Sequence, residues 1–292
     1  MCLEKYTQFR PAQPLLVILL IGTISPCALA EHGDAPKTLT IQVWPTFGIG
    51  GATRPPTIDA GDTFTAAVLV DGLKTDSNAQ VDISSECRLV DENGKLLSGP
   101  YSARNVPHLS FGGTASVHYY AIEIPSDCAP GKYRARVEVT DHIANMRATK
   151  DLLFTIFESQ YGARELRLAY DQAGITTSAG SFVVGQKMYV HYKLTNFATV
   201  DHALHVKNTL TVLTEAQQPV GAPIDLVAQG QVRMFTDSDE LPGVFHLNVN
   251  SPGRFVLRIT FNDELAKRER VVEIPVVCLP ADISSPHRDH MP

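Results

Sequence analysis

The chain has 292 residues, with 25 basic and 31 acidic side chains and a formal net charge of −6 at pH 7. An acidic balance gives no electrostatic reason to bind nucleic acid or anionic lipid, so we expect neither partner. The sequence also lacks a Gly-x-Ser-x-Gly elbow, a His-Glu-x-x-His motif, a Cys-x-x-Cys motif and a phosphate-binding loop. These absences favour a non-enzymatic protein without a cofactor.

Residues 1–30 have the pattern of a secretory signal peptide. Two basic residues precede a short apolar run at 15–24, and the small-residue sequence Ala-Leu-Ala ends at Ala30. The run is too short to span a bilayer, and no second apolar span follows. We expect cleavage after Ala30 and a secreted or periplasmic mature protein with no transmembrane segment. Lipidation at Cys27 is the alternative, which Pro26 directly before it disfavours.

The rest of the chain alternates apolar and polar residues in short runs bounded by Gly, Pro, Asn and Asp. Such period-2 runs are typical of half-buried antiparallel strands. The sequence Asn93-Gly94 adds a strong hairpin signal, and no window shows a sustained helical period. Together these patterns predict an all-β sandwich. In the first half the expected strands lie near 38–44, 62–70, 83–91, 95–98, 117–124, 132–140 and 147–157.

The pattern occurs twice. Residues 130–141 and 252–263 both begin with a Pro-Gly turn, continue as a strand with apolar side chains at alternate positions, and end at Asp. Upstream, residues 61–70 resemble residues 185–194 in the same way. A spacing that drifts by only two residues across several matches predicts two copies of one β module in tandem.

We therefore place module 1 at 38–158, module 2 at 165–279 and a disordered tail at 280–292, with about seven strands in each module. The connection at 158–165 is short, which predicts a preferred angle between the modules. A groove between them is where we expect a ligand. The glycine-rich segment 48–51 leads into two prolines instead of a helix, and we interpret it as a flexible loop.

One feature of the repeated strand resembles a known superfamily. Tyr133 and Ala135 in module 1, and Phe255 and Leu257 in module 2, occupy the places of the tyrosine and the inward residue near the start of strand F of immunoglobulin-like sandwiches. The chain thus resembles the immunoglobulin-like modules of bacterial secreted and surface proteins. The resemblance implies the fold and an extracytoplasmic location. Because Phe255 has no hydroxyl, a tyrosine-corner hydrogen bond is expected only in module 1.

Three cysteines remain after cleavage of the signal peptide. Cys87 corresponds to Leu210 in module 2, and Cys128 lies in a segment that module 2 largely lacks. Because both are missing together from the second copy, and the compartment is oxidising, we predict a Cys87–Cys128 disulfide. Two buried thiols are the alternative. Cys278, near the end of the last strand, is either buried or a minor route to a disulfide-linked dimer.

Two segments carry weak metal-binding signals. Asp237, Asp239 and Glu240 form the densest acidic cluster, and their oxygens at this spacing suit Ca²⁺. His202 and His205 lie close to Asp201, but in a loop and without a fourth ligand. A solvated acidic turn and a polar loop explain the two segments equally well.

Outward aromatic side chains suggest a carbohydrate site. If Tyr120 faces the core, Tyr119 faces outward, and in module 2 Tyr189 and His191 alternate with the inward residues of their strand. Tyrosine offers a sugar a flat apolar face with a polar tip, although strand propensity alone also places tyrosine here.

The sequence as a whole predicts a secreted, non-enzymatic binding, adhesion or envelope-assembly protein. Its expected partner is an envelope or extracellular protein, or a polysaccharide. A carbohydrate-binding protein that uses the outward tyrosines is the second hypothesis. An enzyme with a site between the modules is the third, and it requires convergent polar residues with perturbed pKa values.

Overall fold

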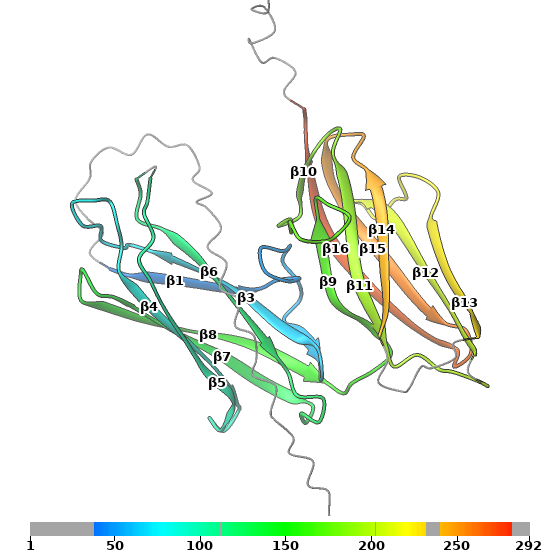
Figure 1. Cartoon of the computed structure of the whole chain (residues 1–292), viewed down its shortest axis with the longest axis horizontal. Helices are drawn as coiled ribbons and strands as arrows, with labels where there is room; N and C mark the ends of the chain where they lie inside the picture. Colours follow the sequence, from blue (N-terminus) through cyan, green and yellow to red (C-terminus); the bar gives the residue numbers. More distant parts are fainter. Residues whose placement is uncertain (1–37, 111, 202, 232–239, 282–292) are drawn as a thin grey trace, which may run out of the picture.

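A computed structural model describes residues 38–110, 112–201, 203–231 and 240–281. Within these ranges the chain forms sixteen β-strands, and they build two β-sandwiches side by side. In the view of Figure 1 the strands of the first sandwich run roughly horizontally and those of the second run roughly vertically. The signal peptide, the Cys27 alternative and residues 282–292 of the expected tail lie outside the described residues.

The first sandwich contains the strands of the first half of the chain. Its smaller sheet has the order β1-β3-β6, and its larger sheet has the order β2-β8-β7-β4-β5. One cluster of buried apolar residues fills the space between the two sheets. The strands are β1 Thr40–Pro45, β2 Thr57–Asp59, β3 Thr63–Asp71, β4 Ile83–Asp91, β5 Leu96–Asn105, β6 Ser116–Glu123, β7 Gly131–Asp141 and β8 Met146–Phe157.

The second sandwich repeats this arrangement strand for strand. Its smaller sheet has the order β14-β11-β9, its larger sheet has the order β10-β16-β15-β12-β13, and a second apolar cluster lies between them. Its strands are β9 Gly162–Ala169, β10 Ser181–Val183, β11 Lys187–Thr195, β12 Ala203–Thr214, β13 Ile224–Gln231, β14 Leu241–Asn248, β15 Gly253–Asp263 and β16 Arg268–Leu279. The all-β fold class predicted from the sequence is confirmed.

Two details of the strand prediction were wrong. Each sandwich has eight strands, because short strands at 57–59 and 181–183 join the larger sheets. These two strands pair in parallel with β8 and β16, so the sheets are not purely antiparallel. A three-residue strand is too short to show a period of two, so its pattern could not be recognised in the sequence.

The apolar residues that alternate along the repeated strands are the ones buried in the two cores. Phe64, Ala66, Val68 and Val70 of β3 are buried, as are Met188, Val190, Tyr192 and Leu194 of β11. Successive side chains of a strand point to opposite faces of the sheet, so one row per strand packs between the sheets. The hairpin at Asn93-Gly94 is also confirmed: it joins β4 to β5, with Gly94 at a φ of +82°.

The Asp that ends each repeated strand is buried and accepts backbone hydrogen bonds. Asp141 accepts from the amides of Lys74, Ile143 and Ala144 at 2.8 to 2.9 Å. In the second sandwich Asp263 accepts from Ala198 and Ala266, and also from an Nη of Arg268 at 2.7 Å. Each carboxylate therefore ties the turn between the last two strands to the loop after β3 or β11. An Asp at this position serves the fold.

The tyrosine corner exists only in the first sandwich, as the sequence predicted. The Tyr133 hydroxyl donates a hydrogen bond of 2.8 Å to the carbonyl oxygen of Ala129, four residues upstream. Phe255 occupies the equivalent position in β15 and is half-buried. The corner fixes the turn before β7 to the body of the first sandwich.

The connection between the sandwiches is shorter than expected. β8 ends at Phe157 and β9 begins at Gly162, which leaves only residues 158–161 between them. Tyr161 is buried and belongs to the core of the second sandwich. So short a connection, anchored at its end, leaves the sandwiches little freedom to separate.

Candidate functional site: the cleft between the two sandwiches

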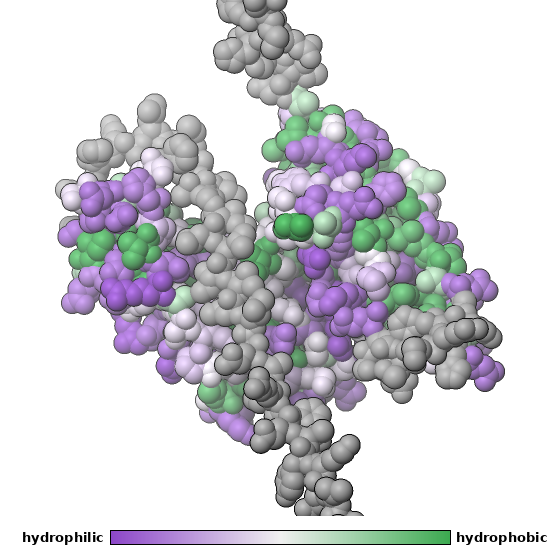
Figure 2. Space-filling model, in the orientation of Figure 1, coloured by the Kyte–Doolittle hydropathy of each residue, from purple (hydrophilic) through white to green (hydrophobic). Residues whose placement is uncertain are grey.

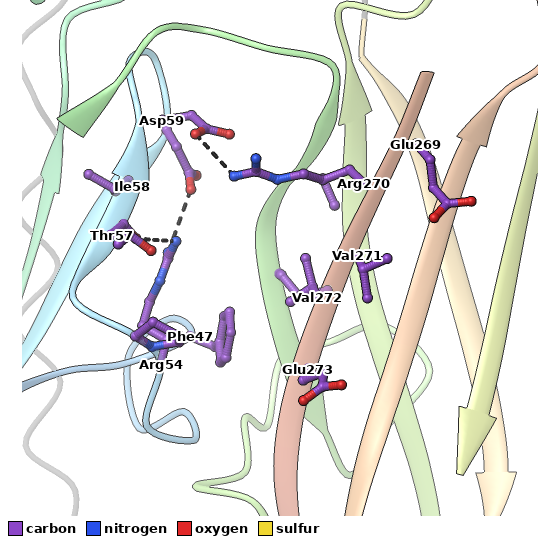
Figure 3. Close-up of a pocket in the computed structure, with 14 residues that line it drawn as sticks. Phe47, Arg54, Thr57, Ile58, Asp59, Glu269, Arg270, Val271, Val272 and Glu273 are labelled. Atoms are coloured by element: carbon purple, nitrogen blue, oxygen red, sulfur yellow. Dashed lines mark hydrogen bonds and ion pairs between the residues drawn. The ribbon is translucent and has the colours of Figure 1, made fainter. Parts of the chain in front are cut away.

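A cleft of about 530 Å³ lies where the sandwiches meet. One wall comes from the segment before and after β2, and the other comes from β9 and the start of β16 (Figure 3). Polar and charged side chains from both walls converge on it. The residues that the argument uses are Phe47, Arg54, Asp59, Asp62, Leu166 and Arg270.

The segment between β1 and β2 belongs to both sandwiches. It leaves β1 in the first sandwich, yet Phe47 and Ala52 are buried in the apolar cluster of the second. A hydrogen bond of 2.8 Å from the Phe47 amide to the Ala52 carbonyl oxygen closes the turn between them. The Thr177 hydroxyl of the second sandwich donates to the Ile49 carbonyl oxygen at 2.7 Å. The flexible loop that we expected at 48–51 is instead a packed part of the joint.

Arg54 and Asp62 form the floor of the cleft. An Nη of Arg54 lies 3.6 Å from a carboxylate oxygen of Asp62, and the side chains are 18% and 8% exposed. The same guanidinium donates to the Thr57 carbonyl oxygen at 2.9 Å and lies over the Phe47 ring, 5.1 Å from its centroid. Arg54 therefore holds the inserted aromatic ring and the buried carboxylate together.

A second ion pair crosses the cleft from one sandwich to the other. An Nη of Arg270, at the start of β16, approaches a carboxylate oxygen of Asp59 on β2 at 3.4 Å, and Figure 3 shows the two side chains pointing toward each other. Burial raises the pKa of Asp59 above its usual value and the nearby charge of Asp62 adds to this, while Arg270 opposes both. The pair is partly desolvated and joins residues 211 positions apart in the sequence.

Backbone contacts complete the joint on the side of β9. An Nη of Arg164 donates to the Ala60 carbonyl oxygen at 3.1 Å, and it also donates to the Ser159 hydroxyl at 2.6 Å. The amide of Glu165 donates to Asp62 at 3.3 Å. Asp62 is therefore in contact with both sandwiches.

A second opening of about 520 Å³ lies on the other side of the same joint. It shares Arg54, Asp62 and Leu166 with the first cleft, and the loop that carries Gly174 and Thr177 covers its other side. The two hollows are thus two faces of one joint between the sandwiches.

The charged side chains of the joint hold the two sandwiches together. Arg54, Asp59 and Asp62 are each paired within the cleft, and the exposed Glu269 and Glu273 form its rim on β16. In the described part of the chain no group of three or more His, Cys, Asp or Glu side chains is arranged to hold a metal ion. The arrangement positions two surfaces relative to each other, and it offers carboxylates and guanidinium groups to a polar partner.

The sequence predicted a groove between the modules but none of the residues that form it. Phe47, Arg54 and Asp59 lie in a stretch without period-2 alternation, where strand patterns carry no information. Arg164 and Arg270 are outward-facing residues, and outward residues of a strand normally face water. The one available signal was Phe47 itself, a large apolar residue among glycines and prolines.

The predicted carbohydrate residues do not form one site. Tyr119 is half-buried on β6 of the first sandwich, where burial raises the pKa of its hydroxyl. Tyr189 is half-buried on β11 of the second sandwich, with its ring centroid 6.5 Å from that of His191.

His191 is on the outward face of β11, as predicted, but it is covered. The loop around Asp171 lies over its ring, its Nε2 is 3.4 Å from the Asp171 carbonyl oxygen, and burial lowers the pKa of the imidazole. The outward position was right, and the expected exposure of His191 was wrong because a long loop folds back over it.

The predicted Cys87–Cys128 disulfide is not formed in this structure, in which both thiols are free and buried. Cys87 lies in the middle of β4, paired in register with Val137 on β7. Cys128 lies in the turn before β7, with its Sγ 3.5 Å from the Tyr133 hydroxyl. Each thiol fills its own place in the core. Cys278 is also free and buried, in the last strand of the second sandwich.

Three of the predicted metal ligands, Asp237, Asp239 and His202, lie outside the described residues. Glu240 is described, and its carboxylate pairs with the Lys193 ammonium at 2.9 Å. His205 lies 3.0 Å from a carboxylate oxygen of Glu264.

No protein-family model matches this chain, and no curated protein matches its sequence. Solved structures match its fold weakly. One is the C-terminal domain of the Streptococcus agalactiae antigen I/II polypeptide BspA, 7% identical over 82% of this chain and 100% of that one, with a TM-score of 0.30. The C-terminal domain of the Streptococcus pyogenes antigen I/II-family protein AspA is 9% identical over 82% and 99%, with a TM-score of 0.27.

A family 123 glycoside hydrolase from Clostridium perfringens is 14% identical over 44% of this chain, with a TM-score of 0.30, and the match spans only 28% of that enzyme. Scores this low carry no argument about function. No helix in the described part of the chain has the length and apolar character needed to cross a membrane.

Proposed function

We propose that this chain is a secreted or periplasmic, non-enzymatic binding protein of the cell envelope, in which two immunoglobulin-like sandwiches act as one unit. The partner is a protein that touches both sandwiches. The expected signal peptide and the envelope location come from the sequence, and the proposal for a single two-sandwich unit comes from the joint.

The observation that carries the proposal is the insertion of the first sandwich into the second. Phe47 and Ala52 lie in the segment that follows β1, and both are buried in the second core. Pulling the sandwiches apart exposes both side chains to water, and full burial of a Phe side chain alone stabilises by about 1.5–3 kcal/mol. A joint that resists opening presents two surfaces at a fixed angle, which lowers the ordering cost of binding a partner across both of them.

Capture from envelope extract tests the proposal. The mature chain, residues 31–292, is immobilised, and a chemical cross-linker is added before elution so that contacts on each sandwich can be mapped by mass spectrometry. A parallel column receives isolated envelope polysaccharide. We expect a specific protein cross-linked to lysines of both sandwiches. Retention of polysaccharide alone, or cross-links confined to one sandwich, contradicts a partner that spans the joint.

A variant of the joint sharpens the result. Phe47→Ala removes the inserted ring, and we expect it to weaken capture about tenfold or more while each sandwich stays folded. Arg104→Ala is the matched control, because Arg104 is exposed and pairs only with Asp82 within the first sandwich. Equal capture by both variants and by the unchanged chain overturns the role of the fixed angle.

A further inference from the structure

The second sandwich has an apolar groove at one end. The groove has a volume of about 240 Å³ and opens at the end of the sandwich where β14 ends and β15 begins. Its walls are almost entirely apolar, with Asn248, Asn250 and Ser251 at the mouth. The side chains that matter for the argument are Met188, Val212, Leu247, Phe255, Val276 and Cys278.

The internal repeat shows what fills this place in the first sandwich. Tyr133 pairs in register with Phe154, as Phe255 pairs with Val276, so Phe154 and Val276 are equivalent. The Phe64 and Phe154 rings stack with their centroids 4.4 Å apart and are nearly inaccessible to water.

Both rings of that stack are replaced in the second sandwich. Phe64 pairs with Ile122 as Met188 pairs with Leu247, which makes Met188 the equivalent of Phe64. Met188 is flexible and narrow, and Val276 has no ring. Together they are smaller than the two rings, and both line the groove although they are themselves only 3% and 2% exposed.

The turn beside this place is also shorter in the second sandwich. From the end of β6 to the start of β7 the chain spends seven residues, 124–130, and the equivalent turn has only four, 249–252. The longer turn carries Cys128, which packs against the Tyr133 hydroxyl and closes the first core. Among the described residues, the four-residue turn of the second sandwich carries no cysteine or other side chain equivalent to Cys128.

Equivalent side chains around this place are less buried in the second sandwich than in the first. Leu89 and Ile122 of the first sandwich are 0% and 1% exposed. Their equivalents Val212 and Leu247 are only half-buried, and so is Phe255. Close-packed cores rarely leave large side chains half covered, so the groove is a place where an apolar group of a partner completes the core.

We propose that this groove binds an aromatic side chain carried on an extended segment of the protein partner. The inference rests on the proposed function and deepens it by naming the chemistry of the partner. The ring lies in the groove against Val276, the equivalent of Phe154, and the exposed Asn248, Asn250 and Ser251 face the backbone that carries it. Val220, 54% exposed, and Ile224, 37% exposed, extend the apolar surface beyond the groove.

Two strands beside the groove have an edge at which such a segment can pair. Among the described residues β13 pairs only with β12, and β14 pairs only with β11. An extended peptide adds main-chain hydrogen bonds at a free edge while its alternate side chains enter pockets. Figure 2 shows apolar surface on both sandwiches, and ten of the fourteen exposed large apolar residues among the described ones belong to the second.

The test uses the whole mature chain and a defined probe. Methionine methyl groups are labelled with ¹³C, because Met188 lines the groove, and the chain is titrated with N-acetyl-phenylalaninamide or, as a control, N-acetyl-alaninamide. We expect a saturable shift of the Met188 methyl resonance with the aromatic probe alone. An equal response to both probes, or no response up to the solubility limit, overturns the proposal.

Variants that copy the first sandwich provide the decisive comparison. Val276→Phe reproduces Phe154 and fills the groove, and we expect at least a tenfold loss of probe affinity in a folded protein. Met188→Phe reproduces Phe64 and replaces Val276→Phe as the test variant if that chain does not fold. Probe binding is then followed by tyrosine fluorescence. Leu153→Phe adds the same ring at a position 66% exposed in the first sandwich and is expected to change nothing. Retained affinity in a folded Val276→Phe chain contradicts the assignment.

Self-association is separated in the same series. If light scattering finds a dimer of the unchanged chain and a monomer of Val276→Phe, the occupant is a second copy, and a foreign partner in the groove is excluded. The envelope capture is an independent measurement, so a groove that binds no aromatic probe leaves a partner spanning both sandwiches to be judged on its cross-links.

Discussion

The two sandwiches have the same strands in the same order, yet they fill the same place in the core with different residues. In the first, Val68 on β3 pairs with His118 on β6. In the second, Tyr192 on β11 pairs with Gly243 on β14. The first pair thus sets a smaller residue, Val68, opposite His118, and the second sets a large residue, Tyr192, opposite a glycine without a side chain. A Cβ at position 243 would overlap the Tyr192 ring.

The polar atoms of these side chains are treated differently in the two cores. The Tyr192 hydroxyl accepts a hydrogen bond of 2.8 Å from Asn208 on the facing sheet. The Nε2 of His118 is buried without a hydrogen-bond partner in the described part of the structure. The comparison teaches that the large side chain of this strand pair lies on β6 in one copy and on β11 in the other, and that of the two polar atoms only the Tyr192 hydroxyl has a hydrogen-bond partner among the described residues.

The largest expected effect comes from the buried carboxylate that both copies share. Asp263→Ala leaves the amides of Ala198 and Ala266 and the Arg268 guanidinium without their acceptor, and we expect the second sandwich to lose about 4 kcal/mol of unfolding free energy. Arg268→Met is the matched control, since Met146 holds the equivalent position in the first sandwich. It should cost about 1 kcal/mol or less, because Arg268 is 44% exposed.

Urea denaturation followed by far-UV circular dichroism measures both variants. Hydrogen exchange assigns the loss to one sandwich. Equal losses from Asp263→Ala and Arg268→Met would show that the backbone hydrogen bonds contribute little and that the ion pair dominates.

The next effect tests the exchange of volume between strands. Gly243→Ala forces a methyl group into the Tyr192 ring, and we expect a loss of about 3 kcal/mol in the second sandwich. Tyr192→Val introduces the residue of the first sandwich and removes the overlap. In a chain that already carries Tyr192→Val, Gly243→Ala should therefore cost less unfolding free energy than it does in the unchanged chain. Strictly additive costs in denaturation experiments would contradict direct competition for one space.

A pH dependence of the stability of the first sandwich is expected from His118. Burial lowers the pKa of His118 to about 4, below the usual value of 6.5 that it has when unfolded. The unfolded chain thus binds more protons between these values, and the stability contributed by neutral His118 is lost as the pH falls through this window. At about 1.4 kcal/mol for each pKa unit, the loss reaches about 3 kcal/mol near pH 4.

Trp44, the single tryptophan of the chain, lies on β1 of the first sandwich. Denaturation followed by its fluorescence from pH 7 to pH 4 should show the loss, and His118→Leu should flatten it. An unchanged pH profile in His118→Leu would assign the acid sensitivity to other groups.

The smallest effect concerns the tyrosine corner. Tyr133→Phe makes the first sandwich like the second at this position and removes the hydrogen bond to Ala129, with an expected loss of about 1 kcal/mol. Phe255→Tyr should bring no gain, because the turn before β15 is three residues shorter and Phe255 is only half-buried, so water competes for the added hydroxyl. Tryptophan fluorescence and circular dichroism measure the first and second variant respectively. A stabilising Phe255→Tyr would show that the shorter turn can still accept the bond.

The sequence alone determined the repeated architecture. Strands with one buried face impose a period of two on their residues, and that period is readable without a structure, as at Phe64 to Val70 and Met188 to Leu194. The tyrosine corner at Tyr133 and the hairpin at Gly94 were also readable, because each depends on residues close together in the chain.

Only the tertiary structure decided the joint and the groove. Arg270 meets Asp59 across 211 positions, and Phe47 enters the core of the other sandwich from a segment without alternation. The groove is lined by Met188 and Val276 and lies beside a short turn, where the first sandwich has two stacked rings and Cys128. Each substitution looks conservative in the sequence, and their sum becomes visible only where the chain brings them together.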